Sequence, residues 1–184
     1  MGKQRGLITR MQAIHAGLSE RQIDHRLATG IWRPAHPGVY MAIECSNDWR
    51  QRAMAACLWA GGGAAVSHRS AGLVWGLDGI VTSLVEITTP RALSHPRVVI
   101  HRSRLLTRDH VTRVGGIPVT SPTRTLLNLS AVVPPQRLEV ALDDALRRGL
   151  TSIVRLELEI GAGTRSGRGP HFAQDAGKLS ARTP

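Results

Sequence analysis

Apolar side chains recur at helical spacing in the first forty residues, and polar residues and glycines separate the runs. Met11, Ile14 and Leu18 are spaced to face one core. Thr9 stands just before them as a helix N-cap, because its hydroxyl can accept hydrogen bonds from the free N–H groups of the first turn. Gly17 follows as a helix stop, since glycine tolerates a positive φ. The pattern therefore predicts a short helix between Thr9 and Gly17.

A second short helix is predicted directly after the first. Ser19 is its N-cap, and Glu20 places an acid in the first turn, where the helix dipole favours negative charge. Ile23 and Leu27 lie four residues apart on its buried face, and Gly30 ends it. The opposite face carries donors and acceptors suited to base edges and phosphates. These side chains are Arg21, Gln22, His25 and Thr29, with Arg26 on the flank.

A two-stranded ribbon is predicted after the helix pair. Residues 32–35 and 39–41 read as strands, and His36-Pro37-Gly38 supplies the turn between them. Two helices followed by such a ribbon outline a winged helix-turn-helix, a DNA-reading module. The predicted contacts with major-groove edges, phosphates and the minor groove are made by Ser19, Arg21, Gln22, His25, Arg26, Arg33, His36, Lys3 and Arg5. The alternative is a small helical hairpin whose polar face is simply solvated.

Helices and strands alternate in the rest of the chain, after a linker from Ala42 to Asn47. Ser46 or Asn47 is expected to cap the next helix, Ser67 caps another, and Ser121-Pro122 starts a third. Helices are predicted over 48–60, 68–75, 123–131, 136–148 and 151–160, and strands over 84–88, 98–102, 111–114 and 117–120.

These elements predict an α+β fold in three parts. Residues 1–45 form the winged helix-turn-helix, and residues 46–160 form a small mixed α/β domain. Residues 161–184 are rich in Gly, Arg, Ser and Pro and cannot bury enough apolar surface to offset the entropy of ordering. They are predicted to be a disordered basic tail.

Charge supports a polyanionic partner. The chain of 184 residues has 24 Lys and Arg against 13 Asp and Glu, a net charge of +11. A basic chain of this size points most often to nucleic acid, although a GC-rich genome also favours arginine. The excess gathers in residues 1–40 and 91–124. A second candidate surface, for a phosphate or an acidic partner, is made by His68, Arg69, Arg91, Arg102 and Arg104.

Other classes of protein are not indicated. Cys45 and Cys57 are too few and too isolated for a disulfide framework or a metal site, and Cys57 is expected to be buried in a helix. The N-terminus has no apolar signal-peptide core, and no apolar run approaches the length of a transmembrane helix. A cytoplasmic protein without membrane contact is expected.

A tripeptide occurs twice, as His68-Arg69-Ser70 and His101-Arg102-Ser103. A histidine close to a serine could be a base with its nucleophile. Residues two apart in a helix or strand seldom reach that geometry, and no orienting carboxylate is near in sequence. A structural or phosphate-binding role is therefore favoured.

Metal chemistry is not favoured either. Asp78 and Glu86 are available, but no Lys follows Glu86 at the spacing of a metal-dependent nuclease. Asp143-Asp144 lies beside two arginines on a helix, which indicates ordinary ion pairing. No metal, cofactor or catalytic residue is expected, and the chain is predicted not to be an enzyme.

The order of motifs resembles one family over about Gly6 to Ile160. The motifs, in order, are GLITRMQAIHAGLSERQIDHRLATGIWRPAHPGVY, VSHRSAGLVWGLDG, VEITTPR, VVIHRSRLL, VTRVGGIPVTSPTRTLLNLS and RLEVALDDALRRGL. They are similar to the AbiEi antitoxins of type IV (abortive infection) toxin–antitoxin systems. By position, residues 19–26 match the recognition-helix segment and 32–33 with 36–40 match the wing. Residues 67–70, 75–77, 118–122 and 124–126 match the second domain.

The resemblance implies a transcriptional regulator that binds its own operator, represses its operon and counteracts a nucleotidyltransferase-like toxin without a tight complex. The match fades after Ile160, as in a short form. Relatives commonly continue there, sometimes into a domain resembling very-short-patch-repair endonucleases. Two alternatives stay open: a remnant of an endonuclease-linked member, or a partner-binding module without sequence-specific DNA binding.

Overall fold

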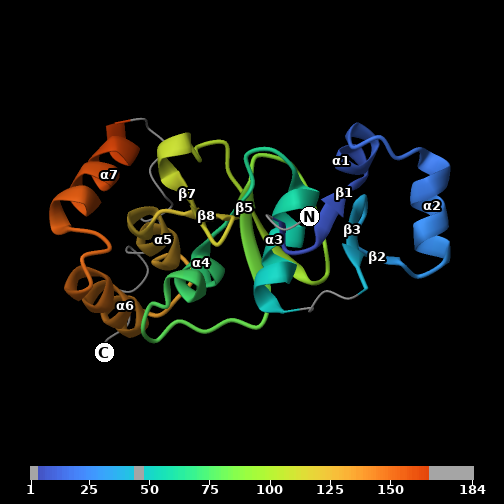
Figure 1. Cartoon of the computed structure of the whole chain (residues 1–184). Helices are drawn as coiled ribbons and strands as arrows, with labels where there is room; N and C mark the ends of the chain where they lie inside the picture. Colours follow the sequence, from blue (N-terminus) through green and yellow to red (C-terminus); the bar gives the residue numbers. More distant parts are fainter. Residues whose placement is uncertain (1–3, 44–47, 166–184) are drawn as a thin grey trace, which may run out of the picture.

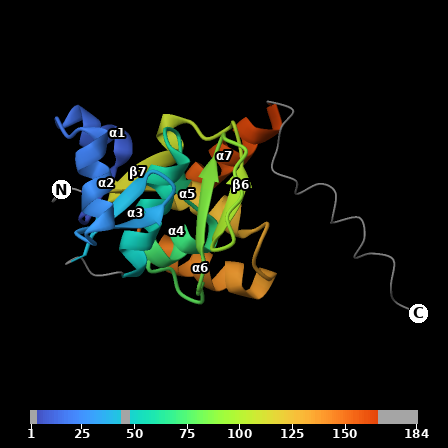
Figure 2. The same cartoon turned by 90° about the vertical axis from the view of Figure 1, so that its right-hand side faces the viewer.

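The computed structural model describes residues 4–43 and 48–165 and has an α+β fold, as the sequence predicted (Figure 1). Its strands form a three-stranded and a five-stranded sheet. The helices α1 and α2 lie at one end of the molecule, and α6 and α7 lie at the other. In Figure 2 the end that carries α2 is turned toward the viewer. None of the described helices is both long and apolar enough to cross a membrane.

The N-terminal residues form two short helices on a small antiparallel sheet. The strand order is β1-β3-β2, with Leu7 opposite Met41 and Trp32 opposite Ala42. The elements are β1 (Leu7–Thr9), α1 (Arg10–His15), α2 (Glu20–Ala28), β2 (Trp32–His36) and β3 (Val39–Ala42). The strand β1 was not predicted, because three residues are too few to show a period of two.

Both predicted N-caps are confirmed. The Gln12 N–H donates to Thr9 Oγ1 over 3.1 Å, and the Gln22 N–H donates to Ser19 Oγ over 3.3 Å. Each cap is one half of a reciprocal capping box, which satisfies backbone donors that a short helix would otherwise leave unpaired. The predicted stop after α1 is also confirmed, since Gly17 has a φ of +91°.

The predicted core face of α1 is wrong at Met11 and Ile14, whereas Leu18 packs against the core as predicted. Met11 is 62% exposed and Ile14 is 37% exposed, whereas Ala13 is fully buried. Ala13 packs with Ile23, which is buried as predicted. A small side chain at this point lets α1 approach α2, so the longer apolar side chains of α1 stay at the surface.

The second sheet has the strand order β6-β5-β4-β8-β7. The pairs β5–β6 and β4–β8 are parallel, and β4–β5 and β7–β8 are antiparallel. The strands are β4 (Ala65–Val66), β5 (Val85–Thr89), β6 (Val98–Arg102), β7 (Val111–Val114) and β8 (Ile117–Thr120). The central strand β4 was missed, since a two-residue strand has no sequence period to detect.

The remaining helices cover the second sheet and extend beyond it. They are α3 (Trp49–Ala60), α4 (His68–Trp75), α5 (Pro122–Leu129), α6 (Pro135–Arg147) and α7 (Ile153–Arg165). A short 3-10 helix, η2 (Arg108–His110), precedes β7. The indole N–H of Trp75 donates to the Thr120 carbonyl over 2.9 Å and so ties α4 to β8. Cys57 is buried in α3, as predicted, and burial raises the pKa of its thiol to about 12.

Two predicted helix ends need correction. Asp48 caps α3, because its Oδ1 accepts from the Gln51 N–H over 2.7 Å. Ser46 and Asn47 lie outside the described residues. The helix α7 continues to Arg165, past the predicted end of the folded part at Ile160. Residues 166–184 of the predicted tail are outside the described residues.

The main core is continuous between the two sheets. Leu7, Val39 and Met41 belong to the same buried cluster as Ala53 of α3 and Ile87 of β5. The helix α3 therefore packs against both the N-terminal sheet and the larger sheet. A separate small cluster of Ala13, Ile23, Trp32 and Tyr40 lies wholly within the N-terminal part.

The other face of β5 is polar, and α4 covers it. Val85 and Ile87 lie in the core that contains α3, whereas Glu86 and Thr88 bind side chains of Ser67 and Arg69 at the start of α4. Because both faces are covered, all five residues of β5 are buried. A strand in which apolar and polar residues alternate usually has one face exposed to solvent. The burial of Glu86 was therefore not expected.

Candidate functional site

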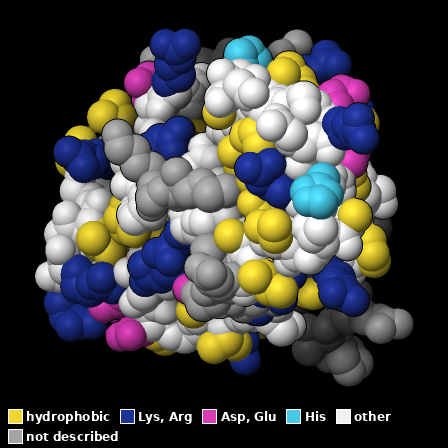
Figure 3. Space-filling model, turned by 45° about the vertical axis from the view of Figure 1, so that its right-hand side comes forward, with side chains coloured by type: hydrophobic (Ala, Val, Ile, Leu, Met, Phe, Trp, Pro, Cys, Tyr) yellow, Lys and Arg dark blue, Asp and Glu magenta, His cyan; other side chains and the backbone are white. Residues whose placement is uncertain are grey.

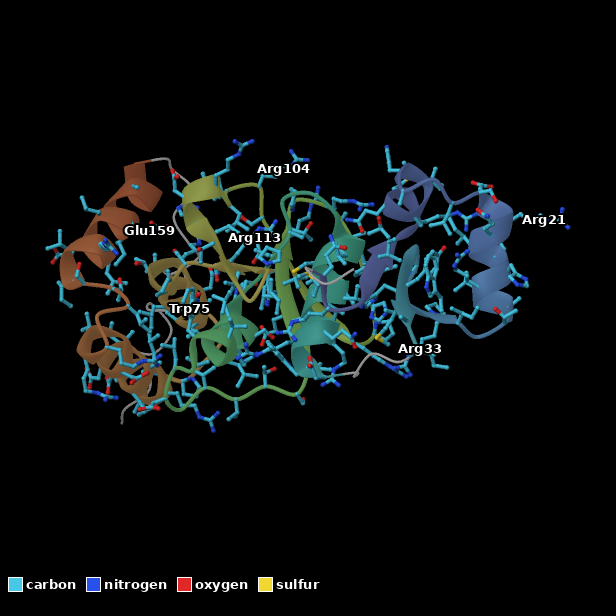
Figure 4. The ribbon with its side chains drawn as sticks, in the orientation of Figure 1. Arg21, Arg33, Trp75, Arg104, Arg113 and Glu159 are labelled. Atoms are coloured by element: carbon cyan, nitrogen blue, oxygen red, sulfur yellow. The ribbon has the colours of Figure 1, made fainter. Side chains whose placement is uncertain are left out.

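The polar face of α2 is exposed at the end of the molecule. Arg21, Gln22 and His25 are exposed, as the helical period predicted. The Arg21 side chain extends away from the body of the protein (Figure 4). Thr29 turns back, and its hydroxyl donates to the His25 carbonyl over 2.8 Å. The face therefore offers its longest donor, Arg21, directly to solvent.

The two acids of α2 lie beside Arg10 of α1. Arg10 Nη1 is 3.1 Å from Asp24 Oδ1, and its Nη2 is 3.6 Å from Glu20 Oε2. Arg10 Nη1 also donates to the Tyr40 hydroxyl over 3.4 Å. Local pairing thus offsets the negative charge of α2, and the exposed arginine keeps its attraction for an anion.

Arg26 and Ser19 have structural roles in addition to any contact they make. The Arg26 guanidinium lies 5.5 Å from the centre of the Trp32 ring and donates to the Gln22 carbonyl over 3.3 Å. The Ser19 hydroxyl is used in the helix cap. Arg26 is therefore held at the flank of α2, between the helix and the ribbon.

The ribbon separates its two predicted contact residues. Arg33 is exposed on β2, whereas the His36 ring stacks on Trp59 at 5.2 Å and meets the edge of His95 at 4.7 Å. Burial, and then the neighbouring His95, lower the pKa of His36 to about 4. His36 is neutral at pH 7 and turned inward, so its predicted contact with phosphate is corrected to a packing role.

The N-terminal contacts are only partly described. Lys3 lies outside the described residues. Arg5 Nη1 is 3.6 Å from Asp48 Oδ2, and the Arg5 carbonyl accepts from Gln51 Nε2 over 2.7 Å. Arg5 thus anchors the start of β1 to α3.

A hollow of about 780 Å³ continues from the ribbon toward the β5–β6 connection. Arg33, Arg52 and Arg97 are among its lining residues. On the face that Figure 3 shows, Lys and Arg side chains are scattered among other side chains. The hollow brings together arginines from β2, from α3 and from the β5–β6 connection.

A second polar group is buried between α4 and the larger sheet. It consists of His68, Glu86 and His101, named here the His–Glu–His centre. Glu86 Oε2 accepts from His101 Nε2 over 3.0 Å, and the His68 and His101 rings stack with centroids 3.4 Å apart. The two repeated tripeptides, 33 residues apart in sequence, therefore bring their histidines into contact.

Glu86 is almost fully buried, with 1% exposure, and needs compensation for the loss of water. Arg69 Nη1 donates to Glu86 Oε1 over 3.2 Å, while the same guanidinium donates to the Val132 carbonyl. The carboxylate thus has an arginine on one oxygen and a histidine on the other. Burial, followed by the nearby His101, Arg124 and Arg69, lowers the pKa of His68 to about 3.

The backbone at the start of α4 is strained. His68 has a φ of +51°, a left-handed conformation that costs a non-glycine residue roughly 1–3 kcal/mol. Ser67 precedes the helix but makes no capping hydrogen bond, contrary to the prediction. Its Oγ instead lies 2.9 Å from His68 Nδ1 and accepts from the Thr88 hydroxyl over 2.8 Å. The local chain is bent to place the His68 ring.

The serines of the two tripeptides bind backbone groups. Ser70 Oγ accepts from the Glu86 N–H over 2.8 Å and donates to the Leu84 carbonyl over 3.2 Å. Ser103 Oγ accepts from the Leu105 N–H over 3.1 Å. Both serine hydroxyls are therefore used in hydrogen bonds to the backbone. The carboxylate that sequence reasoning did not find is Glu86, which the fold supplies from a separate strand.

The other members of the second predicted surface are spread out. Arg91 Nη1 donates to the Ala60 carbonyl over 3.1 Å, and Arg102 and Arg104 are exposed at and beyond the end of β6 (Figure 4 labels Arg104). His68 and Arg69 face the buried carboxylate instead. The five residues therefore do not form one patch.

The ion pairing predicted for α6 is confirmed. Asp144 Oδ2 lies 2.8 Å from Arg148 Nη1, four residues on, and Oδ1 lies 2.5 Å from Arg147 Nη2. The other acid that sequence reasoning considered, Asp78, lies 3.5 Å from Arg147 Nη2. Both acids are thus paired with arginine, away from the His–Glu–His centre.

Comparisons with known proteins support the fold of this chain but do not assign it to a family or a function. No family model and no curated protein matches the chain. Among solved structures, the chain is similar to the RV2827C protein from Mycobacterium tuberculosis, with a TM-score of 0.56 and 17% sequence identity. The match covers 84% of this chain and 66% of that one. At this identity the likeness shows a shared α+β fold alone.

Proposed function

We propose that this chain is a DNA-binding transcriptional regulator, with residues 7–42 acting as a winged helix-turn-helix. The order helix, tight turn, helix and ribbon supports this proposal. The observation that carries it is the exposed face of α2, where Arg21 extends from the end of the molecule while Arg10 pairs with the acids of the same helix.

In the proposed complex, α2 enters the major groove. Arg21 and His25 would donate to base edges, where arginine pairs best with guanine. Arg33 on the ribbon would bind phosphate, and Arg26, held on Trp32, would follow the backbone beside the groove. Arg10 would remain paired with Glu20 and Asp24 and would offset one of their two negative charges, which reduces their repulsion of the DNA.

The regulator is further proposed to be an antitoxin. The motifs that resemble the AbiEi family support this, and they extend through the second sheet and α6. The proposed partner is a nucleotidyltransferase-like toxin, counteracted without a stable complex. Co-expression with the product of a neighbouring nucleotidyltransferase gene tests this. Restored growth is expected, and continued growth arrest with the folded chain present would contradict the antitoxin role.

Fluorescence anisotropy with the DNA upstream of the chain's own gene tests the regulator. The full chain is expected to bind that DNA more tightly than a scrambled duplex of the same composition. Arg21→Ala is expected to weaken specific binding about tenfold to a hundredfold, the loss of one good base contact. Each phosphate contact should add about −0.9 to the log–log salt dependence.

Arg155→Ala provides a matched control. Arg155 is exposed on α7, at the opposite end of the molecule from α2. Its replacement removes the same charge from the chain and should leave specific affinity within about twofold. Equal affinity for upstream and scrambled DNA would contradict a sequence-specific regulator and favour the partner-binding alternative.

A further inference from the structure

We propose that the His–Glu–His centre binds one divalent transition-metal ion of the zinc class, a site that is independent of the proposed DNA interface. One ligand atom from each of His68, Glu86 and His101 lies within 4.8 Å of the other two. Among the described residues, no other set of three histidines, cysteines or acids has ligand atoms this close together.

The three ligand atoms need a limited rearrangement to hold such an ion: the pair in contact must separate slightly, and the third atom must approach. Zinc binds histidine nitrogen and carboxylate oxygen at about 2.1 Å in tetrahedral geometry, which places ligand atoms about 3.4 Å apart. Glu86 Oε2 and His101 Nε2 are already 3.0 Å apart. The metal would take the place of the proton in the hydrogen bond between His101 Nε2 and Glu86 Oε2. A rotation of the stacked His68 and His101 rings would bring the third nitrogen into the same sphere.

Neighbouring groups hold the ligands in the orientation that binding requires. Ser67 Oγ lies against His68 Nδ1, so Nε2 of that ring is left for the metal. Arg69 occupies Glu86 Oε1 and leaves Oε2 for the metal. The positive φ of His68 adds an independent observation, because strain of this kind persists where the surroundings fix a residue for a purpose.

The chemistry of the ligand set selects the class of ion. Two imidazoles and one carboxylate suit zinc, cobalt, nickel and iron, whereas magnesium and calcium prefer oxygen ligands. Three protein ligands leave one tetrahedral position for water. The His101 side chain is 25% exposed, so an ion can enter from that side. The positive charges of Arg69 and Arg124 oppose the ion and should make the site weaker than one with two carboxylates.

The test uses the untagged full chain, stripped with chelator and titrated with zinc chloride by calorimetry. We expect one equivalent to bind and the melting temperature to rise by about 5–10 °C when zinc exceeds its Kd a hundredfold. Millimolar magnesium should not reproduce the shift. Glu86→Gln and His101→Gln should each abolish zinc binding.

The matched control is His110→Gln. His110 Nε2 lies 2.7 Å from Glu159 Oε1, so this pair resembles the His101–Glu86 pair but has no second histidine in its group. This variant should bind zinc like the wild type. No zinc uptake by the wild type, or unchanged uptake by both Glu86→Gln and His101→Gln, would overturn the proposal.

X-ray absorption at the zinc edge of the loaded wild type gives a test that does not depend on variants. A first shell of nitrogen and oxygen with two imidazoles is expected. A shell that contains sulfur, or fewer than two imidazoles, would equally overturn the proposal, even if the variants fail to fold.

Discussion

The α2 face and the His–Glu–His centre both gather polar side chains, but in opposite surroundings. On α2 the side chains stand in water and few of them touch one another. In the centre, Glu86 is 1% exposed and each oxygen of its carboxylate has a fixed partner. A surface that binds a polyanion gains from separate contacts, whereas a buried polar group is stable only as a complete set.

The largest effect on stability should appear when the buried carboxylate of the centre is removed, and an exposed acid of α6 serves as the control. Glu86→Ala leaves Arg69 and His101 without their shared acceptor. Breaking a buried ion pair in this way should lower the free energy of unfolding by about 3 kcal/mol, as measured by urea denaturation. Glu139→Ala removes an exposed acid of α6 and should change stability by no more than about 0.5 kcal/mol. Similar, small effects of both variants would contradict the account of the centre.

The helix pair can be tested at its closest contact. Ala13→Leu adds volume where Ala13 is fully buried, and should cost about 1–3 kcal/mol of unfolding free energy through overpacking. Met11→Ala alters a side chain that is 62% exposed and should cost less than about 0.5 kcal/mol. Thermal melts of the two variants measure the difference, and a larger loss from Met11→Ala would restore the face that the sequence predicted.

Acid should destabilise the protein through two histidines, the partly buried His36 of the ribbon and the buried His68 of the centre. Burial lowers the pKa of His36 to about 4 and that of His68 to about 3. The ordinary value, about 6.5, applies in the unfolded chain, so between about pH 6.5 and pH 4 the unfolded state binds more protons. The neutral rings therefore make their full contribution to the free energy of unfolding above about pH 6.5, and this contribution falls as the pH decreases. The slope approaches about 1.4 kcal/mol per pH unit for each histidine.

The variant His36→Phe keeps a ring against Trp59 and removes one of the two histidines that take up a proton on unfolding in this pH range. The slope of unfolding free energy against pH should become shallower than in the wild type. His25→Ala, at an exposed position, is the control and should leave the slope unchanged. An unaltered slope in His36→Phe would show that His36 is not buried as a neutral ring.

The two regions also differ in how far sequence could predict them. Thr9, Ser19 and Gly17 act within three or four residues, so their caps and turn followed from local chemistry. The exposed face of α2 followed from the helical period. Met11 was misplaced because period alone does not say which side of a six-residue helix meets its neighbour.

The His–Glu–His centre could not be predicted in the same way. Its members come from α4, β5 and β6, and they meet because β5 and β6 pair in parallel with Thr88 opposite His101. The third member, His68, follows β4, a two-residue strand without a sequence signal. The one available clue was the repeated His-Arg-Ser tripeptide, which marked both histidines but not the carboxylate between them.

We propose that DNA binding belongs to the α2 face and not to the His–Glu–His centre. Anisotropy titration of Arg21→Ala and His101→Gln against the upstream DNA, with both variants confirmed as folded, tests it directly. We predict a loss of about tenfold or more in affinity for Arg21→Ala and a change within about twofold for His101→Gln. Unchanged affinity in Arg21→Ala together with a large loss in His101→Gln would contradict the account.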